Sequence, residues 1–177
     1  MKRLEIQSAS NSSFQKAWEL YLEAFPINER RELTVQKQML QHSDYHFEVF
    51  LKNNEFIGFI AWWQFDGLRF VEHFATLDIH RGKGYGKLVL EDFISESKEL
   101  VLLEVEHPST EIDQRRIGFY ERIGFKLNPY EYQQLPLRKS GEKVDLLVMT
   151  YPSAINIEVL ENFENDFKVK CFEGYFN

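Results

Sequence analysis

The apolar positions at the start of the chain predict one strand followed by two helices. The strand is expected over residues 4–7. The first helix begins at Ser12 or Ser13, which offer an N-cap, and ends before Pro26, which stops a helix. Its apolar residues recur at helical spacing, at Phe14, Ala17, Trp18, Tyr21 and Phe25. A second helix with a thinner apolar stripe is expected over residues 29–42.

From residue 46 onward the pattern changes to one that is typical of strands. Strands are expected over residues 46–52, 56–65 and 68–77. Asn53-Asn54 is a credible first turn, because asparagine tolerates a positive φ, and Asp66-Gly67 is a stronger hairpin signal. These segments therefore predict an antiparallel meander.

After the meander, helices and strands alternate. The expected elements are a helix from the glycine-rich loop at 82–86 to about residue 97, a strand over 100–105, a helix over 109–123, and strands over 125–127 and 144–149. The tail after Pro152 has room for one more short helix. This order predicts a mixed α+β fold with one central, mostly antiparallel twisted sheet flanked by helices. No repeat or linker divides the chain, so we expect a single domain over residues 1–177.

Composition narrows the function classes. The formal net charge of -7 argues against a general nucleic-acid binder and is compatible with a cationic amine substrate. The single cysteine, Cys171, excludes an internal disulfide, and the histidines lack metal-ligand spacing, so no metal is expected. No stretch approaches the ~20 apolar residues of a membrane span. We therefore expect a cytoplasmic protein without membrane contact, either a monomer or a homodimer.

The strongest chemical signal is the loop Arg81-Gly82-Lys83-Gly84-Tyr85-Gly86, which lies between a strand and a helix. N–H groups at a helix start lack partners, and the helix dipole adds positive charge there. Glycines let a phosphate approach the backbone, and Arg81, Lys83 and Lys87 can pair with it. The loop therefore predicts a pyrophosphate site. The alternative is a glycine-rich turn before a surface helix.

The form of the loop limits the classes of phosphate-containing ligand that it can bind. A Walker loop needs G-x-x-x-x-G-K-[ST], which the chain lacks, and a dinucleotide fingerprint needs a third glycine that is missing here. The form present is R-x-x-G-x-G, at Arg81, Gly84 and Gly86.

Two motifs occur in a specific order. Phe74-Ala75-Thr76 is followed, after four residues, by Arg81 to Gly86, and Phe119-Tyr120 is followed by Gly124-Phe125. In this register the chain resembles the GNAT superfamily of acetyl-CoA-dependent N-acetyltransferases. The resemblance covers about residues 3–150 and leaves 151–177 as a C-terminal extension. Aromatic residues of this extension are expected to pack on the domain or on a partner chain, at Phe163, Phe167, Phe172, Tyr175 and Phe176.

The resemblance implies acetyl-CoA as co-substrate and a set of residues that bind it. Backbone groups of Phe74 and Thr76 would hold the pantetheine arm, and N–H groups from Arg81 to Lys87 would hold the pyrophosphate. The whole expected set is Phe74, Ala75, Thr76, Arg81, Gly82, Lys83, Gly84, Tyr85, Gly86, Lys87 and Asp113. Tyr120 matches the tyrosine that often protonates the departing thiolate, and core packing is its alternative role.

Two positions depart from the family's pattern. The family often has Asn and Ala seven and four residues before that tyrosine, where this chain has Asp113 and Arg116. A carboxylate accepts hydrogen bonds but cannot donate one as an amide does. Arg116 is also bulky beside the expected cofactor arm.

Acyl transfer to an amine needs a group that removes a proton, since a free amine is mostly protonated at neutral pH. Glu72 is the first candidate, because strand alternation places it on one face with Phe74 and Thr76 if no bulge intervenes. An exposed strand carboxylate is the equal alternative, and His73 should point the opposite way. Glu104 and Glu106 are expected as polar lining of the cleft or as solvent-facing groups.

The segment 29–32 reads more as a solvated helix start than as a substrate site. In the family, however, the first two helices commonly wall the acceptor pocket, so Phe25, Arg30 and Trp62-Trp63 could shape specificity. The predicted activity is acetyl transfer from acetyl-CoA to a primary amine of a small molecule or peptide. Two alternatives stay open: a non-catalytic acyl-CoA-binding module, and an acyltransferase that uses another acyl-CoA or a hydroxyl acceptor.

Overall fold

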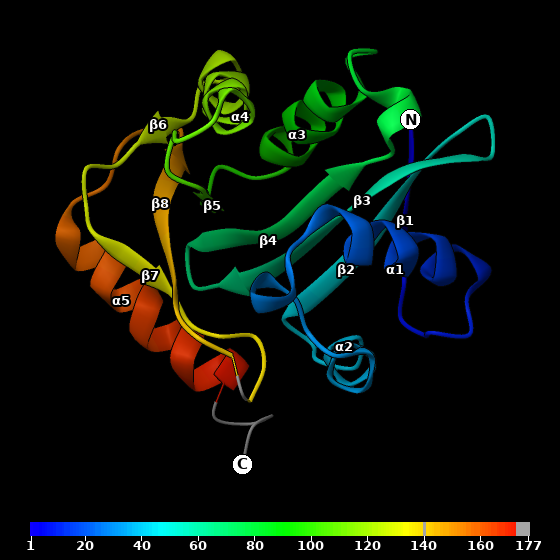
Figure 1. Cartoon of the computed structure of the whole chain (residues 1–177), viewed down its shortest axis with the longest axis horizontal. Coiled ribbons are helices and arrows are strands. Elements are labelled where there is room, and N and C mark those ends of the chain that lie inside the picture. Colours follow the sequence, from blue (N-terminus) through cyan, green and yellow to red (C-terminus); the bar gives the residue numbers. More distant parts are fainter. Residues whose placement is uncertain (140, 173–177) are drawn as a thin grey trace.

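The computed structural model describes residues 1–139 and 141–172 and shows one mixed sheet between two layers of helices (Figure 1). The strands are β1 (Lys2–Glu5), β2 (Tyr45–Lys52), β3 (Glu55–Phe65), β4 (Leu68–Thr76), β5 (Leu100–Val105), β6 (Lys126–Leu127), β7 (Tyr132–Gln134) and β8 (Val144–Tyr151). The helices are α1 (Ser12–Ala24), α2 (Leu33–Met39), α3 (Tyr85–Ser95), α4 (Glu111–Ile123) and α5 (Ile157–Phe167). The sheet order is β1-β2-β3-β4-β5-β8-β6, and β7 also pairs with β8.

The predicted fold class and antiparallel meander are confirmed. Asn53 and Asn54 have φ values of 52° and 63° and turn β2 into β3, and Gly67, with φ of 68°, turns β3 into β4. Among the described strands, β4 and β5 form the one parallel pair. Such a pair needs a crossover, which α3 supplies.

The sheet buries a separate core on each face. Helices α1, α2 and α5 cover one face through residues such as Trp18, Met39 and Phe163. Helices α3 and α4 cover the other face through Phe93 and Ile117, and Figure 1 shows these two layers on opposite sides of the strands. Helices therefore cover much of each face of the sheet.

The tail beyond β8 belongs to the first of these cores. Phe163 and Phe167 of α5 are buried, with their ring centroids 4.9 Å and 5.3 Å from that of Phe70 on β4. A π-helical turn, Lys168–Phe172, follows α5. Tyr175 and Phe176, for which packing was also expected, lie outside the described residues. The boundary that separates 151–177 as an extension stays a prediction.

Two elements differ from the expectation. The helix expected over 29–42 is a 3-10 turn, Ile27–Glu29, an extended stretch and the shorter α2. Arg31 lies in the extended stretch with 1% of its surface exposed, so this segment is not a solvated helix start. The stretch between the strands expected over 125–127 and 144–149, for which no element was predicted, contains β7, which pairs with β8 and buries the alternate residues Tyr132 and Gln134. No helix among the described residues is both long and apolar enough to cross a membrane.

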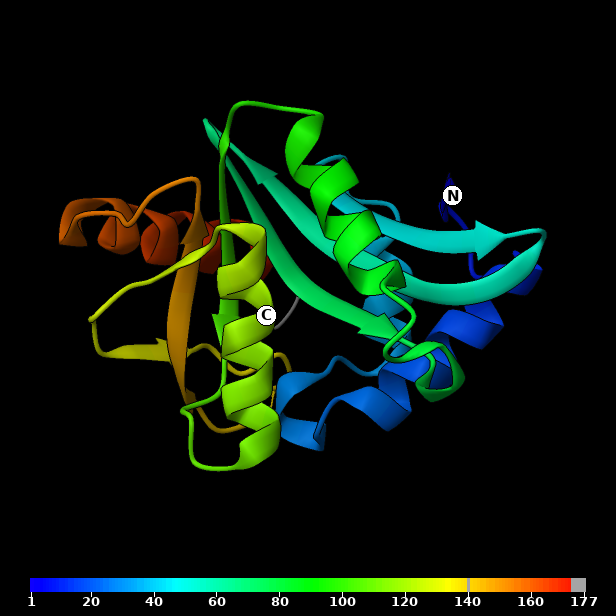
Figure 2. The same ribbon diagram turned by 90° about the horizontal axis from the view of Figure 1, so that it is seen from above.

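Strands β4 and β5 part at their carboxyl ends, and this geometry creates the site. They pair only from Leu68 and Leu100 to Val71 and Leu103, although β4 runs on to Thr76. Figure 2 shows the two strands spreading into a V that is open toward their carboxyl ends. On the side of β5, the edge of β4 beyond Val71 therefore presents backbone N–H and C=O groups that pair with no described strand, which suits an extended ligand.

Candidate active site

The V between β4 and β5 is the floor of a cleft with a volume of about 870 Å³. Segments on both sides of the sheet contribute to its walls, including the loop before α3, one side of α4 and the segment after α1. The predicted residues that line it are Glu72, Phe74, Ala75, Thr76, Arg81, Gly82, Gly84, Tyr85, Gly86, Lys87 and Tyr120. Lys83 and Asp113 do not line it.

The glycine loop has the geometry of an anion site. Gly82 and Gly84 have φ values of 75° and 79°, and Gly84 is the N-cap of α3. The first helical bond runs from the N–H of Leu88 to the carbonyl oxygen of Gly84 (3.1 Å), so the N–H groups of residues 85–87 have no partner within the helix. Backbone donors and the dipole of α3 therefore converge on one end of the cleft.

Basic side chains surround this end of the cleft. Arg81, which is exposed, pairs with Asp78 (2.8 Å) rather than with the cleft wall. Lys52 was not predicted here: its ammonium donates a hydrogen bond to the Tyr85 hydroxyl (2.9 Å). Helix α4 contributes three further cations to the lining of the cleft as a whole, Arg115, Arg116 and Arg122. A ligand with several phosphate oxygens would neutralise this charge.

Asp113 has a structural role in α4. Its carboxylate accepts hydrogen bonds from the N–H and hydroxyl of Thr110 (2.9 and 2.7 Å), while its own N–H donates to the Thr110 hydroxyl oxygen (3.2 Å). This reciprocal capping box stabilises the first turn of α4. The hydrogen bonds of the Asp113 carboxylate are thus accounted for by the helix cap. The expected contact of Asp113 with the cofactor stays a prediction. Arg116, the other departure from the family pattern, forms an ion pair with Glu106.

Glu72 forms a buried ion pair with Arg31. The exposed fractions of the two side chains are 0% and 1%, and the guanidinium donates to both carboxylate oxygens, one of them at 2.6 Å. Trp63 donates a further hydrogen bond to the carboxylate from Nε1 (3.1 Å). Burial alone would raise the pKa of Glu72, but Arg31 and His73 outweigh this effect and lower it to about 2. The expectation of an exposed carboxylate at this position is wrong.

A β-bulge explains the position of Glu72. In the register with β3, Ala61 pairs with His73 and Trp62 pairs with Val71, so Glu72 is an extra residue. The bulge places Glu72 and Phe74 on opposite faces of the sheet, because Glu72 contacts Arg31 whereas Phe74 packs with the α3 and α4 core. The shared face predicted for Glu72, Phe74 and Thr76 is therefore wrong.

His73 is buried on the α1 side of the sheet. Its ring lies between Tyr21 and Phe25, with centroid distances of 4.7 and 4.6 Å. Its Nε2 donates to the carbonyl oxygen of Glu29 (2.7 Å), which anchors the turn after α1. Both His73 and Phe25 line the cleft. The Nδ1 atom of His73 lies 3.3 Å from a carboxylate oxygen of Glu72, so the expectation that these two side chains point opposite ways is wrong.

Glu104 is a second carboxylate in the cleft, for which the sequence predicted only a polar lining or solvent-facing role. It lies half-buried on β5 and accepts hydrogen bonds from the Tyr132 hydroxyl and from the side-chain amide of Gln134. Burial raises the pKa of Glu104 to about 8, although these two hydrogen bonds oppose the shift. The signal that could have found it is a charged residue inside a strand that is otherwise entirely apolar, over Leu100–Val105.

Tyr120 reaches the cleft from α4. Only 7% of the surface of Tyr120 is exposed, and its ring lies against those of Phe119 and Phe125. Among the described residues none hydrogen-bonds its hydroxyl. Burial raises the pKa of Tyr120 to about 12, and the charges of Arg116 and Glu106 act in opposite directions. The hydroxyl therefore keeps its proton at neutral pH and is free to donate it.

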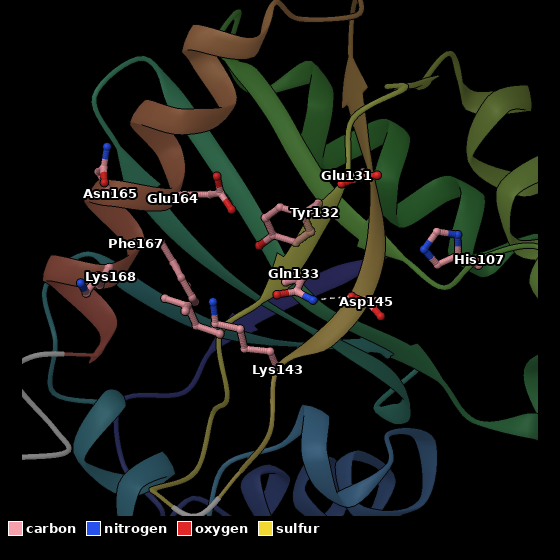
Figure 3. Close-up of a pocket in the computed structure, with 11 residues that line it drawn as sticks. His107, Glu131, Tyr132, Gln133, Lys143, Asp145, Glu164, Asn165, Phe167 and Lys168 are labelled. Carbon is pink, nitrogen blue, oxygen red and sulfur yellow. Dashed lines mark hydrogen bonds between the residues drawn. The ribbon is translucent and has the colours of Figure 1, made fainter.

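A second depression lies between the β7–β8 pair and α5 (Figure 3). Gln133 from β7 and Asp145 from β8 are joined there by a hydrogen bond of 2.7 Å, and Glu164 projects from α5. Tyr132 also lines this depression, while its hydroxyl reaches Glu104 in the cleft. Strand β7 thus separates the two hollows.

Comparison with known proteins agrees with this geometry. A family model described as an acetyltransferase (GNAT) domain matches residues 43–127. A protein from Bacteroides thetaiotaomicron assigned to the GNAT acetyltransferases is 30% identical, with a TM-score of 0.88 over 100% of this chain and 99% of that one. No curated protein sequence matches the chain.

Two more distant structures share the fold. The ribosomal-protein-S18-alanine N-acetyltransferase from Escherichia coli is 18% identical, with a TM-score of 0.61 over 88% of this chain and 95% of that one. A GNAT-family acetyltransferase from Elizabethkingia anophelis, solved with acetyl-CoA bound, is 16% identical, with a TM-score of 0.59 over 84% and 95%.

The fold and the cleft thus define an enzyme that transfers acyl groups. More particularly, the chain belongs to the GNAT family of acetyltransferases, because a relative of 30% identity matches it over its whole length.

Proposed function

We propose that the enzyme transfers the acetyl group of acetyl-CoA to a primary amine of a small molecule or peptide. The observation that carries this proposal is the free Tyr120 hydroxyl in a cleft that ends at the anion site formed by Gly82, Gly84 and the start of α3. Support comes from the similar fold of a structure solved with acetyl-CoA bound. The amine acceptor is supported by the name of the Escherichia coli structure, an alanine N-acetyltransferase.

Two parts of the cleft would bind two different parts of acetyl-CoA. The N–H groups of the loop and of residues 85–87 would hold the pyrophosphate, and the free edge of β4 from Phe74 to Thr76 would hold the pantetheine arm. Acetyl-CoA supplies an acyl group that is activated as a thioester. This assignment keeps the predicted binding set except Lys83 and Asp113, which do not line the cleft.

Two protons must move during transfer. The amine nitrogen forms a bond to the acyl carbon while the carbon–sulfur bond breaks, the amine loses a proton, and the thiolate gains one. We assign the donor to Tyr120, whose hydroxyl keeps its proton at neutral pH. A carboxylate on the other side of the V would accept the proton of the amine.

Two carboxylates are candidates for the group that accepts the proton of the amine. Glu72 was the first candidate, but a carboxylate with a pKa near 2 that is held by Arg31 is a weak proton acceptor. Glu104, with a pKa of about 8, is matched to neutral pH and pairs with no cation among the described residues. We therefore favour Glu104 as the base and assign Glu72 to positioning the acceptor wall.

An acetyl-CoA turnover assay tests the proposal. Release of free CoA that depends on added primary amines, with N-acetyl product found by mass spectrometry, is the expected result. Turnover only with hydroxyl acceptors or only with longer acyl-CoA molecules would contradict it. Selective acetyl-CoA binding without turnover, across a panel of small amines and peptides, would point to the non-catalytic alternative.

A further inference from the structure

We call the part of the cleft between the segment after α1 and strand β5 the acceptor half. Two carboxylates there form no ion pair with a cation. Glu29 lies in the turn after α1 and Glu104 lies on β5, and both are half-buried and line the cleft. Neither carboxylate forms an ion pair within residues 1–139 and 141–172. The other two cleft acids, Glu72 and Glu106, each pair with an arginine. The acceptor half therefore contains two carboxyl groups, on separate elements, that form no ion pair with any described cation.

A buried amide beside Glu104 also lacks a partner. Gln134 lines the cleft, and only 3% of its surface is exposed. Its Nε2 donates to Glu104, but its side-chain oxygen, Oε1, receives no hydrogen bond from any described residue. A buried acceptor without a hydrogen bond is unfavourable, because it has lost its contact with water and gained no partner. A ligand with several N–H donors would satisfy both this oxygen and the neighbouring carboxylate.

Apolar side chains line the same part of the cleft. Phe25 from the end of α1 and Leu146 from β8 are among the residues that wall it. An acceptor that fits both features carries methylene groups along these side chains and positive charge at the carboxylates.

We infer that the acceptor is an aliphatic di- or polyamine, whose reacting amine lies at Glu104 and Gln134 and whose second ammonium group binds Glu29. This inference rests on the proposed amine acetylation. Burial raises the pKa values of both Glu29 and Glu104, and nearby carboxylates add to this effect, whereas His73 and Arg116 oppose it at Glu29. A bound cation would favour the ionised form of both carboxyl groups. Glu29 then becomes the residue that selects for a second charge.

Initial rates of CoA release with three acceptors test this inference: putrescine, spermidine and n-butylamine, which lacks the second ammonium group. For the wild type, we expect kcat/KM for the diamine to exceed that for the monoamine by about tenfold or more, the effect of one charged hydrogen bond. Glu29→Gln should remove most of this preference through KM and leave n-butylamine within about twofold. Glu164→Gln, a half-buried glutamate in the second depression, is the matched control and should change neither acceptor.

Calorimetric titration of every variant with acetyl-CoA distinguishes failure of this inference from failure of the proposed function. Equal rates for diamine and monoamine, or an equal loss for both in Glu29→Gln, would overturn the inference and leave amine acetylation standing. So would acetylation of a peptide N-terminus but of none of these amines. If acetyl-CoA does not bind the folded wild type, the proposed function fails, and the inference fails with it.

Discussion

Arg31 and Glu72 form a bidentate ion pair that ties the segment after α1 to the bulge in β4. The backbone N–H of Arg31 also donates to the Tyr21 hydroxyl (2.7 Å), so α1 joins the same network. The acceptor wall is thus held to the strand on which the pantetheine arm is proposed to bind. The pair has a positioning role that does not require Glu72 to touch the substrate.

The variant Arg31→Met should be strongly destabilised. Removing one member of a buried pair leaves an unpaired charge, which typically costs about 3–5 kcal/mol in the free energy of unfolding. Urea denaturation measures this loss. The double variant Arg31→Met/Glu72→Leu is the control and should recover much of the stability, because it leaves no unpaired buried charge.

The same pair gives wild-type stability an acid-sensitive component. The pKa of Glu72 falls from 4.5 to about 2 on folding, so the stabilisation is present above pH 4.5 and is lost as the pH falls toward 2. We expect the free energy of unfolding to decline across this window in the wild type. An Arg31→Met variant with an equally steep decline there would show that the pair is not its source.

The variant Glu104→Gln should lose the rise of kcat/KM with pH near 8. Glu104 accepts a proton only when ionised, and its pKa is about 8, whereas the ammonium of the substrate titrates near 10. Loss of a general base typically lowers the rate by about 100-fold or more. A pH–rate profile that keeps this limb in Glu104→Gln and loses it in Glu72→Gln would return the role of base to Glu72.

Glu104→Gln should make the protein more stable than the wild type above pH 8, although it lowers activity. The folded-state pKa of about 8 exceeds the ordinary value of 4.5, so the native state holds the proton more tightly than the unfolded chain. Wild-type stability should therefore fall as the pH rises from 4.5 through 8. Because the amide cannot ionise, Glu104→Gln should lack this decline in urea denaturation at several pH values.

The variant Tyr120→Phe should lower kcat by about tenfold or more, since the thiolate would leave without a proton donor. The affinity for acetyl-CoA should stay within about twofold, because the ring still fills its place in the core. Steady-state kinetics and calorimetry separate the two effects. Tyr130→Phe, which loses a hydrogen bond to Ile155 and does not line the cleft, should keep the wild-type rate. Unchanged turnover in Tyr120→Phe would make Tyr120 a purely structural residue.

The variant Gly84→Val should weaken acetyl-CoA binding by about tenfold or more, because a side chain would meet the approaching phosphate. Gly84 has φ of 79°, so some strain accompanies the substitution. Gly67→Val is a matched control, since Gly67 has φ of 68° and equally open surroundings at a hairpin turn far along β4. Equal losses of affinity in both variants would mean that strain and not the phosphate site is responsible.

Much of the fold could be predicted because local patterns determine it. The apolar stripe from Phe14 to Tyr21, the turn at Asp66-Gly67 and the strand at 100–105 all lie where they were expected. Strand β7 was missed, because three residues with one polar exposed position give too short an alternation to detect. The second helix begins later than expected, since buried Arg31 needs an extended segment to reach Glu72.

The site was predictable only where it is local in sequence. The glycine loop, Phe74–Thr76 and Tyr120 line one cleft, as their motifs implied. The bulge at Glu72 depends on the register with β3, and the pKa of Glu104 depends on burial and on partners from β7. These are contacts between residues far apart in the chain, which a single sequence does not reveal.

The central claim is that the cleft at the Gly82–Gly84 loop binds acetyl-CoA. Calorimetric titration of the purified protein with acetyl-CoA, with NADH and ATP as controls, tests it most directly. We predict selective binding with a Kd on the order of micromolar. A folded protein that shows no heat of binding with acetyl-CoA, or that binds NADH or ATP equally well, would contradict the claim.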